Sequence, residues 1–316
     1  MTRPRRSSGL PAAPTVEDLI RHGAARFRTA RLSFGHGMGD AVDEAAALVF
    51  HALGLAHTDA AEAYRQQPSP DDVERLLATF EQRIARRVPA AYLMRRMWFA
   101  GHEFEVDERV IVPRSPIAEL IDARFVPWLE PARVRRVLDI GTGSGCIAIA
   151  CALALPAAQV DAVDLSPEAL AVARRNVAHH AVGERVRLLE GDVYAPLGSE
   201  RYELVVANPP YVSEGEMRRL PKEYRHEPDL ALRAGSDGLD VARRILAGLP
   251  ERLAPGGVLV LEVGNSEGRL QRAYPGVPFT WLEFERGGGG VCLLTQEQAL
   301  RHAAELRAGA VPTGRG

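Results

Sequence analysis

The sequence predicts an α/β protein with a doubly wound, mostly parallel sheet of seven strands, preceded by a small all-α domain and a β-hairpin linker. Beyond residue 131, short apolar β-type runs alternate with helical runs, as expected of a parallel sheet with crossover helices. Before residue 97, apolar residues recur at three- and four-residue steps, which indicates amphipathic helices. With 316 residues, 46% of them hydrophobic, the chain is long enough for one large core and one smaller core.

Changes in this pattern predict four regions. Residues 1–97 form the helical domain, with breaks at the glycine-rich residues 33–40 and at residues 67–71. Residues 98–113 form a hairpin whose turn is the charged run Asp107-Glu108-Arg109. Residues 114–300 form the sheet domain, and residues 301–316 form a tail that becomes disordered after residue 308.

The sheet domain is expected to hold seven strands and a late helix. Because only the glycines of 287–290 separate the last two strands, these should pair as an antiparallel hairpin. The helix should cover residues 239–253. The strands are expected at residues 134–140, 159–165, 186–189, 204–207, 258–263, 279–284 and 291–294.

Composition excludes several classes of protein. A formal net charge of −2 gives no general attraction to nucleic acid. No apolar run reaches the ~18 to 20 residues that span a bilayer, and the arginine- and serine-rich start precedes no apolar segment, so we expect a cytoplasmic protein without membrane contacts. The three cysteines fit neither a disulfide framework nor a metal site, and no histidine has suitably spaced partners, so no metal is expected. The arginines at positions 83–96 favour a solvated helix face over an RNA-binding surface.

A glycine-rich loop follows the first predicted strand of the sheet. The run Gly141-Thr142-Gly143-Ser144-Gly145 lies between residues 137–140 and a helix that begins at Cys146. Glycines at the N-terminus of a helix allow the backbone to approach a ligand, and this is where doubly wound sheets bind nucleotides. The spacing differs from the Gly-x-Gly-x-x-Gly of pyrophosphate-binding loops. A nucleoside-cofactor loop is therefore predicted, with a tight β-to-α turn as the alternative.

Acidic residues follow three of the predicted strands. Asp164 could accept hydrogen bonds from both ribose hydroxyls of S-adenosylmethionine (SAM) or of a nicotinamide cofactor, or it could cap the helix that begins near Ser166. Asp192 could accept from an adenine amino group or simply form a turn. Asp139 could position the glycine loop or face the amino-acid part of the cofactor.

The run Asn208-Pro209-Pro210-Tyr211 after an apolar strand discriminates best between functions. Two prolines stiffen the turn and leave carbonyl oxygens in fixed directions. The Asn208 side-chain oxygen and a proline carbonyl could hold both N–H groups of an amide or amine that is to be methylated. Tyr211 would stack on the planar substrate group or lie near the cationic sulfur. The alternative is a rigid turn at the edge of the sheet.

At these residues the sequence resembles the class I methyltransferases and, within them, the glutamine N(5)-methyltransferases that modify peptide-release factors and a ribosomal protein. The resemblance covers nearly the whole chain, and that family also joins a helical N-terminal domain to a SAM-binding domain by a β-hairpin. Besides residues 208–211, three segments look like its motifs: Phe99-Ala-Gly-His-Glu-Phe104, Val112-Pro-Arg-Ser-Pro-Ile-Ala-Glu119 and His226-Glu-Pro-Asp-Leu-Ala-Leu232.

One motif departs from the release-factor enzymes. Those enzymes typically have an acidic residue and threonine after Pro-Arg-Pro, whereas this chain has Ser115-Pro116-Ile117. With Tyr224-Arg-His-Glu-Pro228 and Pro278-Phe-Thr-Trp-Leu-Glu283, this variant resembles the family members that act on large-subunit ribosomal protein L-three. The resemblance implies SAM as cofactor, S-adenosylhomocysteine as product, and a glutamine of that ribosomal protein, free or in the assembling large subunit, as substrate.

The resemblance also implies roles for individual residues. The expected glutamine contacts are Asn208, Pro209, Pro210 and Tyr211, of which Asn208, Pro209 and Tyr211 are the expected catalytic residues. The expected cofactor contacts are Asp139, Gly141, Thr142, Gly143, Ser144, Gly145, Asp164, Leu165, Asp192, Val193 and Asn208.

Four alternatives remain open. One is a release-factor methyltransferase, which would use the same glutamine chemistry. A DNA adenine methyltransferase should carry a basic target-recognition insert, which is not apparent, so no direct DNA binding is expected. A nicotinamide oxidoreductase leaves residues 208–211 unexplained. A binding module without catalytic activity is the fourth.

Overall fold

The computed structural model describes residues 9–55 and 60–309, and it divides the chain into two compact units. One unit comprises Met1–Arg95 and Pro221–His226, and the other comprises Arg96–Leu220 and Glu227–Gly316. The basic start of the chain and the residues after 309 lie outside the described ranges. Within those ranges, no helix is long and apolar enough to cross a membrane.

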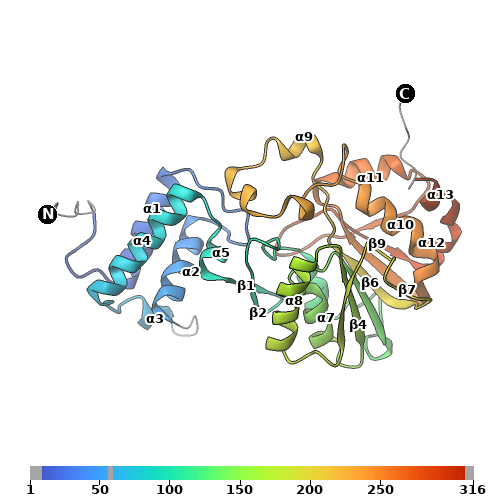
Figure 1. Ribbon diagram of the computed structural model, residues 1–316, viewed down its shortest axis with the longest axis horizontal. Helices are drawn as coiled ribbons and strands as arrows, with labels where there is room; N and C mark the ends of the chain where they lie inside the picture. The colour runs from blue at the N-terminus through green and yellow to red at the C-terminus, as the bar shows by residue number, and fades with distance from the viewer. Residues whose placement is uncertain (1–8, 56–59, 310–316) are drawn as a thin grey trace. The chain divides into compact units, whose positions relative to one another are not determined.

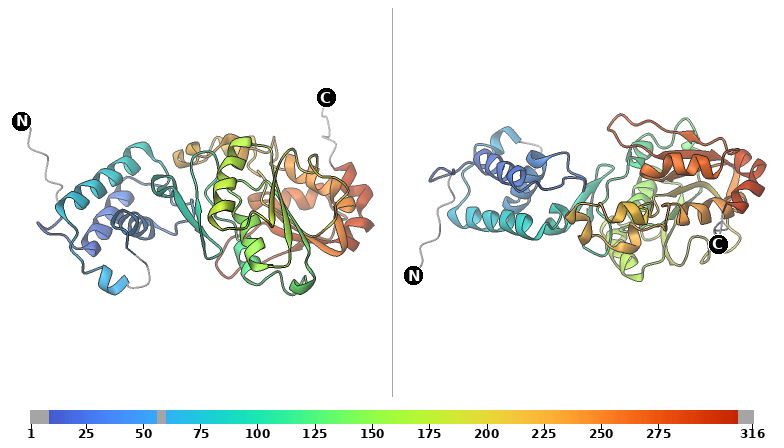
Figure 2. Two further views of the ribbon diagram at one scale, coloured as in Figure 1. Left: turned by 60° about the horizontal axis from the view of Figure 1, so that its bottom comes forward. Right: turned by 90° about the horizontal axis from the view of Figure 1, so that it is seen from above.

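The first unit is a bundle of helices, coloured blue to cyan in Figure 2. Its helices begin at side-chain caps, because Thr15, Asp40 and Ser69 each accept a hydrogen bond from a backbone N–H of the first turn. The breaks predicted from the glycine-rich and proline-rich stretches therefore fall where α2 and α4 begin. The helices are α1 (Val16–Thr29), α2 (Ala41–Leu53), α3 (Ala60–Ala63), α4 (Pro70–Arg86) and α5 (Ala90–Met94).

Arg83 corrects the prediction of a solvated arginine face. It lies on the same side of α4 as buried Leu76 and Phe80, and its own side chain is fully buried. Its Nε donates to Glu44 Oε1 at 2.7 Å, and its Nη1 lies 3.8 Å from Glu223 Oε1. Arg87 also donates to Glu223, at 3.0 Å. These arginines hold a buried ion-pair cluster of the helical unit, whereas Arg86 is exposed as predicted.

The β-hairpin is present, but its turn lies elsewhere than predicted. Strands β1 (Arg96–Phe99) and β2 (His102–Glu105) are antiparallel and are joined by Ala100 and Gly101. Both residues have positive φ, 45° and 76°, as a tight two-residue hairpin turn requires. Asp107 comes after β2, and its carboxylate accepts hydrogen bonds from Arg109 and Arg175. The charged run therefore forms a braced loop after the hairpin.

The second unit contains the predicted seven-stranded sheet (Figure 1). Its strand order is β5-β4-β3-β6-β7-β9-β8, and all neighbours are parallel except those paired with β9. The single antiparallel strand and the final hairpin agree with the prediction, although β8 is only two residues long. The strands are β3 (Arg136–Ile140), β4 (Gln159–Asp164), β5 (Val186–Glu190), β6 (Tyr202–Ala207), β7 (Leu253–Glu262), β8 (Thr280–Trp281) and β9 (Val291–Thr295).

Alternating side chains of the central strands build a core on each face of the sheet. Val258 and Val260 of β7 point into the core shared with α6 and α7, whereas Leu259 and Leu261 point into the core shared with α10 and α13. The helices and 3₁₀ turns are α6 (Ile117–Asp122), η2 (Pro131–Arg133), α7 (Cys146–Ala154), α8 (Pro167–His179), α9 (Glu214–Met217), η3 (Lys222–His226), η4 (Asp229–Ala231), α10 (Asp240–Arg252), η5 (Gly264–Ser266), α11 (Glu267–Ala273), α12 (Gln296–Arg301) and α13 (Ala303–Ala308).

The structure also differs from the prediction at the C-terminal end. Residues 303–308, placed in the tail, form α13, and its Leu306 is fully buried. The apolar side of this short helix packs against α10 and extends the core on that face of the sheet.

Candidate active site

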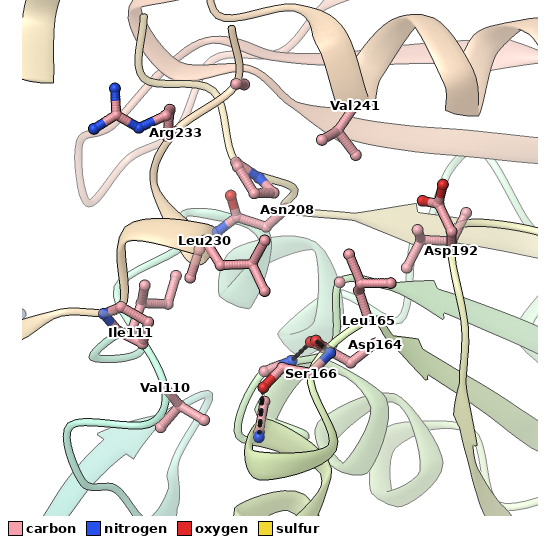
Figure 3. A pocket seen from close by; sticks show the side chains of 18 of the residues that line it. Val110, Ile111, Asp164, Leu165, Ser166, Asp192, Asn208, Leu230, Arg233 and Val241 are labelled. Atoms are coloured by element: carbon pink, nitrogen blue, oxygen red, sulfur yellow. Dashed lines mark hydrogen bonds between the residues drawn. The ribbon is translucent and has the colours of Figure 1, made fainter. Parts of the chain in front are cut away.

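A cavity of about 600 Å³ opens at the carboxyl ends of β3, β4 and β6 (Figure 3). The chain turns from β3 to β4 on one side and later returns to β6 on the other side of β3, so the strand order reverses here. At such a switch point the two connections leave the sheet in opposite directions and a crevice forms between them. Its volume lies within the ~300 to 1,000 Å³ range of small-molecule sites.

The glycine loop forms the floor of the cavity. Gly141, Gly143 and Gly145 have φ values of 76°, 56° and 81°, which favour glycine. No heavy atom lies within 4 Å of the place where a Cβ of Gly143 would be, so the backbone is open to a ligand there. A Cβ on Gly141 would instead lie 3.7 Å from the Pro209 Cα and 3.9 Å from the Asn208 carbonyl oxygen. The predicted cofactor loop and the predicted acceptor motif therefore lie side by side, as the pairing of Ile140 with Ala207 requires.

Four predicted cofactor contacts are absent from the cavity wall: Asp139, Thr142, Ser144 and Gly145. Asp139, Thr142 and Ser144 are buried. Asp139 Oδ2 accepts from the Thr142 hydroxyl at 2.6 Å and from the Ala148 N–H at 3.1 Å, whereas Oδ1 has no partner among the described residues. Burial raises the pKa of Asp139 to about 7, against the lowering effect of these two donors. Of its two predicted roles, the geometry supports positioning of the loop.

Asp164 lines the cavity and braces the loop. Its Oδ2 accepts from the Gly143 N–H at 2.8 Å, and its Oδ1 accepts from the Ser166 N–H at 2.9 Å. Burial raises the pKa of Asp164, and the N–H donors oppose that shift. The N-cap of α8 is Ser166, whose hydroxyl accepts from the Ala169 N–H, so Asp164 does not serve as the cap. The neighbouring Leu165 also lines the cavity and is 51% exposed.

Asp192 and Val193 also line the cavity, and Figure 3 shows Asp192 on the same side as Leu165. The Asp192 carboxylate forms an ion pair with Arg244 of α10, a partner that the sequence pattern did not indicate. Both side chains are about half exposed, at 47% and 43%. A ligand at this wall would therefore meet a carboxylate that is already paired.

The Asn-Pro-Pro-Tyr turn is divided between the cavity and the protein interior. Asn208 and Pro210 line the cavity, whereas Pro209 is buried against the glycine loop. Tyr211 is absent from the cavity wall: its hydroxyl donates to Glu262 at 3.2 Å, and a Cβ on Gly264 would lie 2.7 Å from its ring. The structure therefore does not place Tyr211 on the wall of this cavity, because β7 and the loop after it hold the ring, and its contact with the substrate or the sulfur stays a prediction.

Further cavity-lining residues were missed by the sequence patterns. Ile111 follows the hairpin, and Leu230 lies on η4 with 54% of its surface exposed. In Figure 3 Leu230 lies beside Asn208, and Ile111 lies farther out on the same side. The available signals were the family-like segments 112–119, which Ile111 directly precedes, and 226–232, which contains Leu230. The structure adds that Glu227 accepts from the Val112 N–H at 3.0 Å and pairs with Arg114, which joins the two segments.

The strand order with one antiparallel strand, a glycine loop at the switch point and an Asn-Pro-Pro-Tyr turn beside that loop define a class I methyltransferase. Residues 123–222 match the family model "Methyltransferase small domain". The chain is 47% identical over 302 residues to a "Ribosomal protein uL3 glutamine methyltransferase" of Burkholderia pseudomallei, which covers 93% of this chain and 96% of that one. It therefore belongs to the ribosomal protein uL3 glutamine methyltransferase family.

A second sequence relative agrees with this assignment, and solved structures show a more distant likeness. A protein of the same name from Xanthomonas campestris is 48% identical over 294 residues, which are 92% of this chain and 94% of that one. Among solved structures, the hMettl16 catalytic domain in complex with an RNA hairpin covers 73% of this chain and 82% of its own, at 18% identity and a TM-score of 0.48. A methyltransferase from Pyrococcus furiosus covers 61% and 88%, at 19% identity and a TM-score of 0.45.

Proposed function

We propose that this enzyme transfers a methyl group from SAM to the side-chain amide nitrogen of a glutamine in ribosomal protein uL3. The observation that carries the proposal is that Gly141, Asn208 and Pro210 line the same cavity, since this joins a cofactor loop and an amide-binding turn in one site. The choice of acceptor is supported by relatives that are named ribosomal protein uL3 glutamine methyltransferase and are 47–48% identical over at least nine-tenths of the chain.

The donor set of the cavity fits SAM. Each carboxylate oxygen of Asp164 accepts one backbone N–H, from Gly143 or from Ser166. The lone pairs that these two bonds do not use would accept from the ribose hydroxyls. The exposed apolar side chain of Leu165 and the buried Val193 would flank the adenine. The adenine amino group would donate a hydrogen bond to Asp192. When bound, SAM supplies an electrophilic methyl group on a sulfonium. Burial raises the pKa of Asp164, and a sulfonium cation bound near this carboxyl would oppose that shift by favouring the ionised form.

The acceptor would be held by the turn itself. No described residue forms a hydrogen bond with the Asn208 side chain, and Figure 3 places this amide at the cavity beside Leu230. Its oxygen would accept one N–H of the substrate glutamine, and a proline carbonyl would accept the other. Both bonds orient the nitrogen for attack and favour the loss of its proton once the new C–N bond makes it cationic. No strong base is required for this sequence of events.

Selection between protein substrates would come from surfaces outside the cavity. A pocket that binds one glutamine side chain cannot distinguish the proteins that present it. The helical unit and the β1–β2 hairpin, which carries Trp98 with 54% of its surface exposed, are the candidate surfaces. The peptide-release-factor alternative uses the same chemistry and differs only in this selection.

The test is methyl transfer from radiolabelled SAM to purified uL3, followed by tandem mass spectrometry to locate the modified glutamine. Free uL3 and assembly intermediates should be methylated, mature ribosomes poorly and release factors not at all. Asn208→Ala is the matched negative control. A release factor methylated faster than uL3 would overturn the substrate assignment and leave the glutamine chemistry standing. Labelling of a DNA duplex in place of protein would overturn both.

A further inference from the structure

Glu262 is a buried carboxylate that the proposed chemistry does not use. It is the last residue of β7 and is 4% exposed. Its Oε2 accepts from the Ser115 hydroxyl, and its Oε1 accepts from the Tyr211 hydroxyl at 3.2 Å. Burial raises the pKa of Glu262, while the two hydroxyls and the nearby Arg114 oppose that shift. A buried acceptor restricts its donors more than a solvated one does, because water does not readily replace them there.

The rest of Tyr211 is held by the chain that follows β7. The Ser266 hydroxyl donates to the Tyr211 carbonyl oxygen at 3.1 Å. A Cβ on Gly238 would lie 2.4 Å from that carbonyl oxygen, and a Cβ on Gly264, which has a φ of 48°, would lie 2.7 Å from the ring. Glycine at these positions therefore lets two loops close around the tyrosine. The hydroxyl is the part of Tyr211 that Glu262 orients.

Tyr211 in turn determines where Asn208 lies. The two residues are separated only by Pro209 and Pro210, whose rings fix φ near −65° and leave few degrees of freedom. The amino-terminal side of the turn is fixed by β6, whose Ala207 pairs with Ile140 and Leu261. With one end set by the sheet and the other by Tyr211, the direction of the Asn208 amide depends on both ends.

We propose that Glu262 is a positioning residue for methyl transfer, which holds the Tyr211 hydroxyl and thereby orients the Asn208 amide toward the acceptor glutamine. This inference rests on the function proposed above. It also assigns a role to Ser115, because the same carboxylate accepts from the Ser115 hydroxyl, whose oxygen accepts from the Ile117 N–H at the start of α6 at 3.2 Å. The segment 112–115 and the acceptor turn are thus joined through one side chain.

The test compares Glu262→Ala, Glu262→Gln and Tyr211→Phe, alone and in combination, by steady-state kinetics on uL3 and by calorimetric titration of SAM. Glu262→Ala should lower kcat about 10- to 100-fold, since misplacement of an acceptor by about an ångström has effects of that size. The KM for uL3 and the Kd for SAM should stay within threefold, because neither docking surface nor cofactor loop changes. Glu262→Gln should recover kcat to within about fivefold of wild type, since its carbonyl still accepts from Tyr211.

Tyr211→Phe should lower kcat about tenfold. Adding Tyr211→Phe to Glu262→Ala should lower kcat less than twofold further, because the two changes remove the same hydrogen bond. The matched control is Asp161, a second largely buried carboxylate, which accepts from the Tyr202 hydroxyl at 2.8 Å and is absent from the cavity wall. Asp161→Ala should lower the melting temperature and leave kcat within twofold. Tyr202→Phe should behave in the same way.

Independent, additive losses in the double variant would overturn the proposal, as would a kcat within twofold of wild type for both Glu262→Ala and Tyr211→Phe. If Glu262→Ala does not fold, the test uses Tyr211→Phe, which keeps the packing of the ring, together with Glu262→Gln. A kcat of Tyr211→Phe within twofold of wild type then overturns the proposal. Failure of the proposed function is a different result, since the wild-type protein would then leave every uL3 glutamine unmethylated.

Discussion

The two sides of the cavity are held in place by different means. On the cofactor side, Thr142 and Gly143 of the loop are bound by Asp139 and Asp164, which lie three and 21 residues away in sequence. On the acceptor side, Tyr211 is bound by Glu262, 51 residues away, and that carboxylate also binds Ser115, at a separation of 147 residues. The cofactor loop is thus fixed by local geometry, and the acceptor turn by tertiary structure. Substitutions on the two sides should therefore change different kinetic constants.

The largest effect is expected from Asn208→Ala. Removing the side-chain oxygen that would orient the substrate amide should lower kcat by at least ~10²- to 10³-fold, the range found when one preorganised hydrogen-bonding group is lost from an active site. Because the glycine loop is unchanged, the Kd for SAM should stay within about threefold. Turnover assays beside calorimetric titration measure both quantities. Activity within a few-fold of wild type would contradict the role given to Asn208.

Asp164→Ala should show the opposite pattern. It removes the acceptor for the ribose hydroxyls and also the partner of the Gly143 N–H, so the cofactor should bind at least about 10- to 100-fold more weakly, which corresponds to roughly 1.5 to 3 kcal/mol for the loss of one bond to a charged acceptor. At saturating SAM, kcat should recover to within a few-fold of wild type. Titration with NAD is the control, and tighter binding of NAD than of SAM by the wild-type protein would favour the oxidoreductase alternative.

Asp139 should make the free energy of unfolding depend on pH. Its pKa is about 7 in the folded protein against an ordinary value of 3.8, so between about pH 4 and 7 the unfolded chain loses a proton that the folded protein retains. The free energy of unfolding should fall as pH rises through this window, by at most about 1.4 kcal/mol per pH unit, and level off above it.

Asp139→Asn does not titrate and should lack that contribution. Urea denaturation of both proteins from pH 4 to 8 measures the difference between their unfolding free energies, which cancels the other carboxylates. A difference that stays constant with pH would show that the Asp139 carboxyl is ionised across the whole range.

The smallest effect is expected from Asp192→Ala. Its ion pair with Arg244 is about half exposed, so the free energy of unfolding should change by less than about 1 kcal/mol. SAM should bind only a few-fold more weakly, since a carboxylate exposed to water and already paired contributes less than one fixed by two backbone N–H groups. A loss as large as that of Asp164→Ala would place adenine recognition mainly at Asp192.

The same contrast explains what the sequence could predict. The glycine loop, Asp164 and Asn208 were identified because strand, loop and helix signals lie within a few residues of one another. The position of Tyr211 could not be inferred, because its partner Glu262 ends an apolar strand with no local sign of the pairing. The hairpin turn was missed because Ala100 adopts a positive φ that alanine rarely takes. Arg83 was misassigned although its spacing from Leu76 and Phe80 placed it on the buried stripe of α4.

The segment Pro221–His226 limits how modular this protein can be. In sequence it lies between the acceptor turn and the cavity-lining residues that begin at Pro228. It nevertheless folds with the helical unit, so the chain passes between the two units three times. Its Glu223 is 1% exposed and bonds to Arg87 and to the Ser33 N–H. A shortened protein that begins at Arg96 would leave this carboxylate without those partners. Gene fusion or domain exchange at the single junction near residue 95 would therefore transfer an incomplete enzyme, and both units must be inherited together.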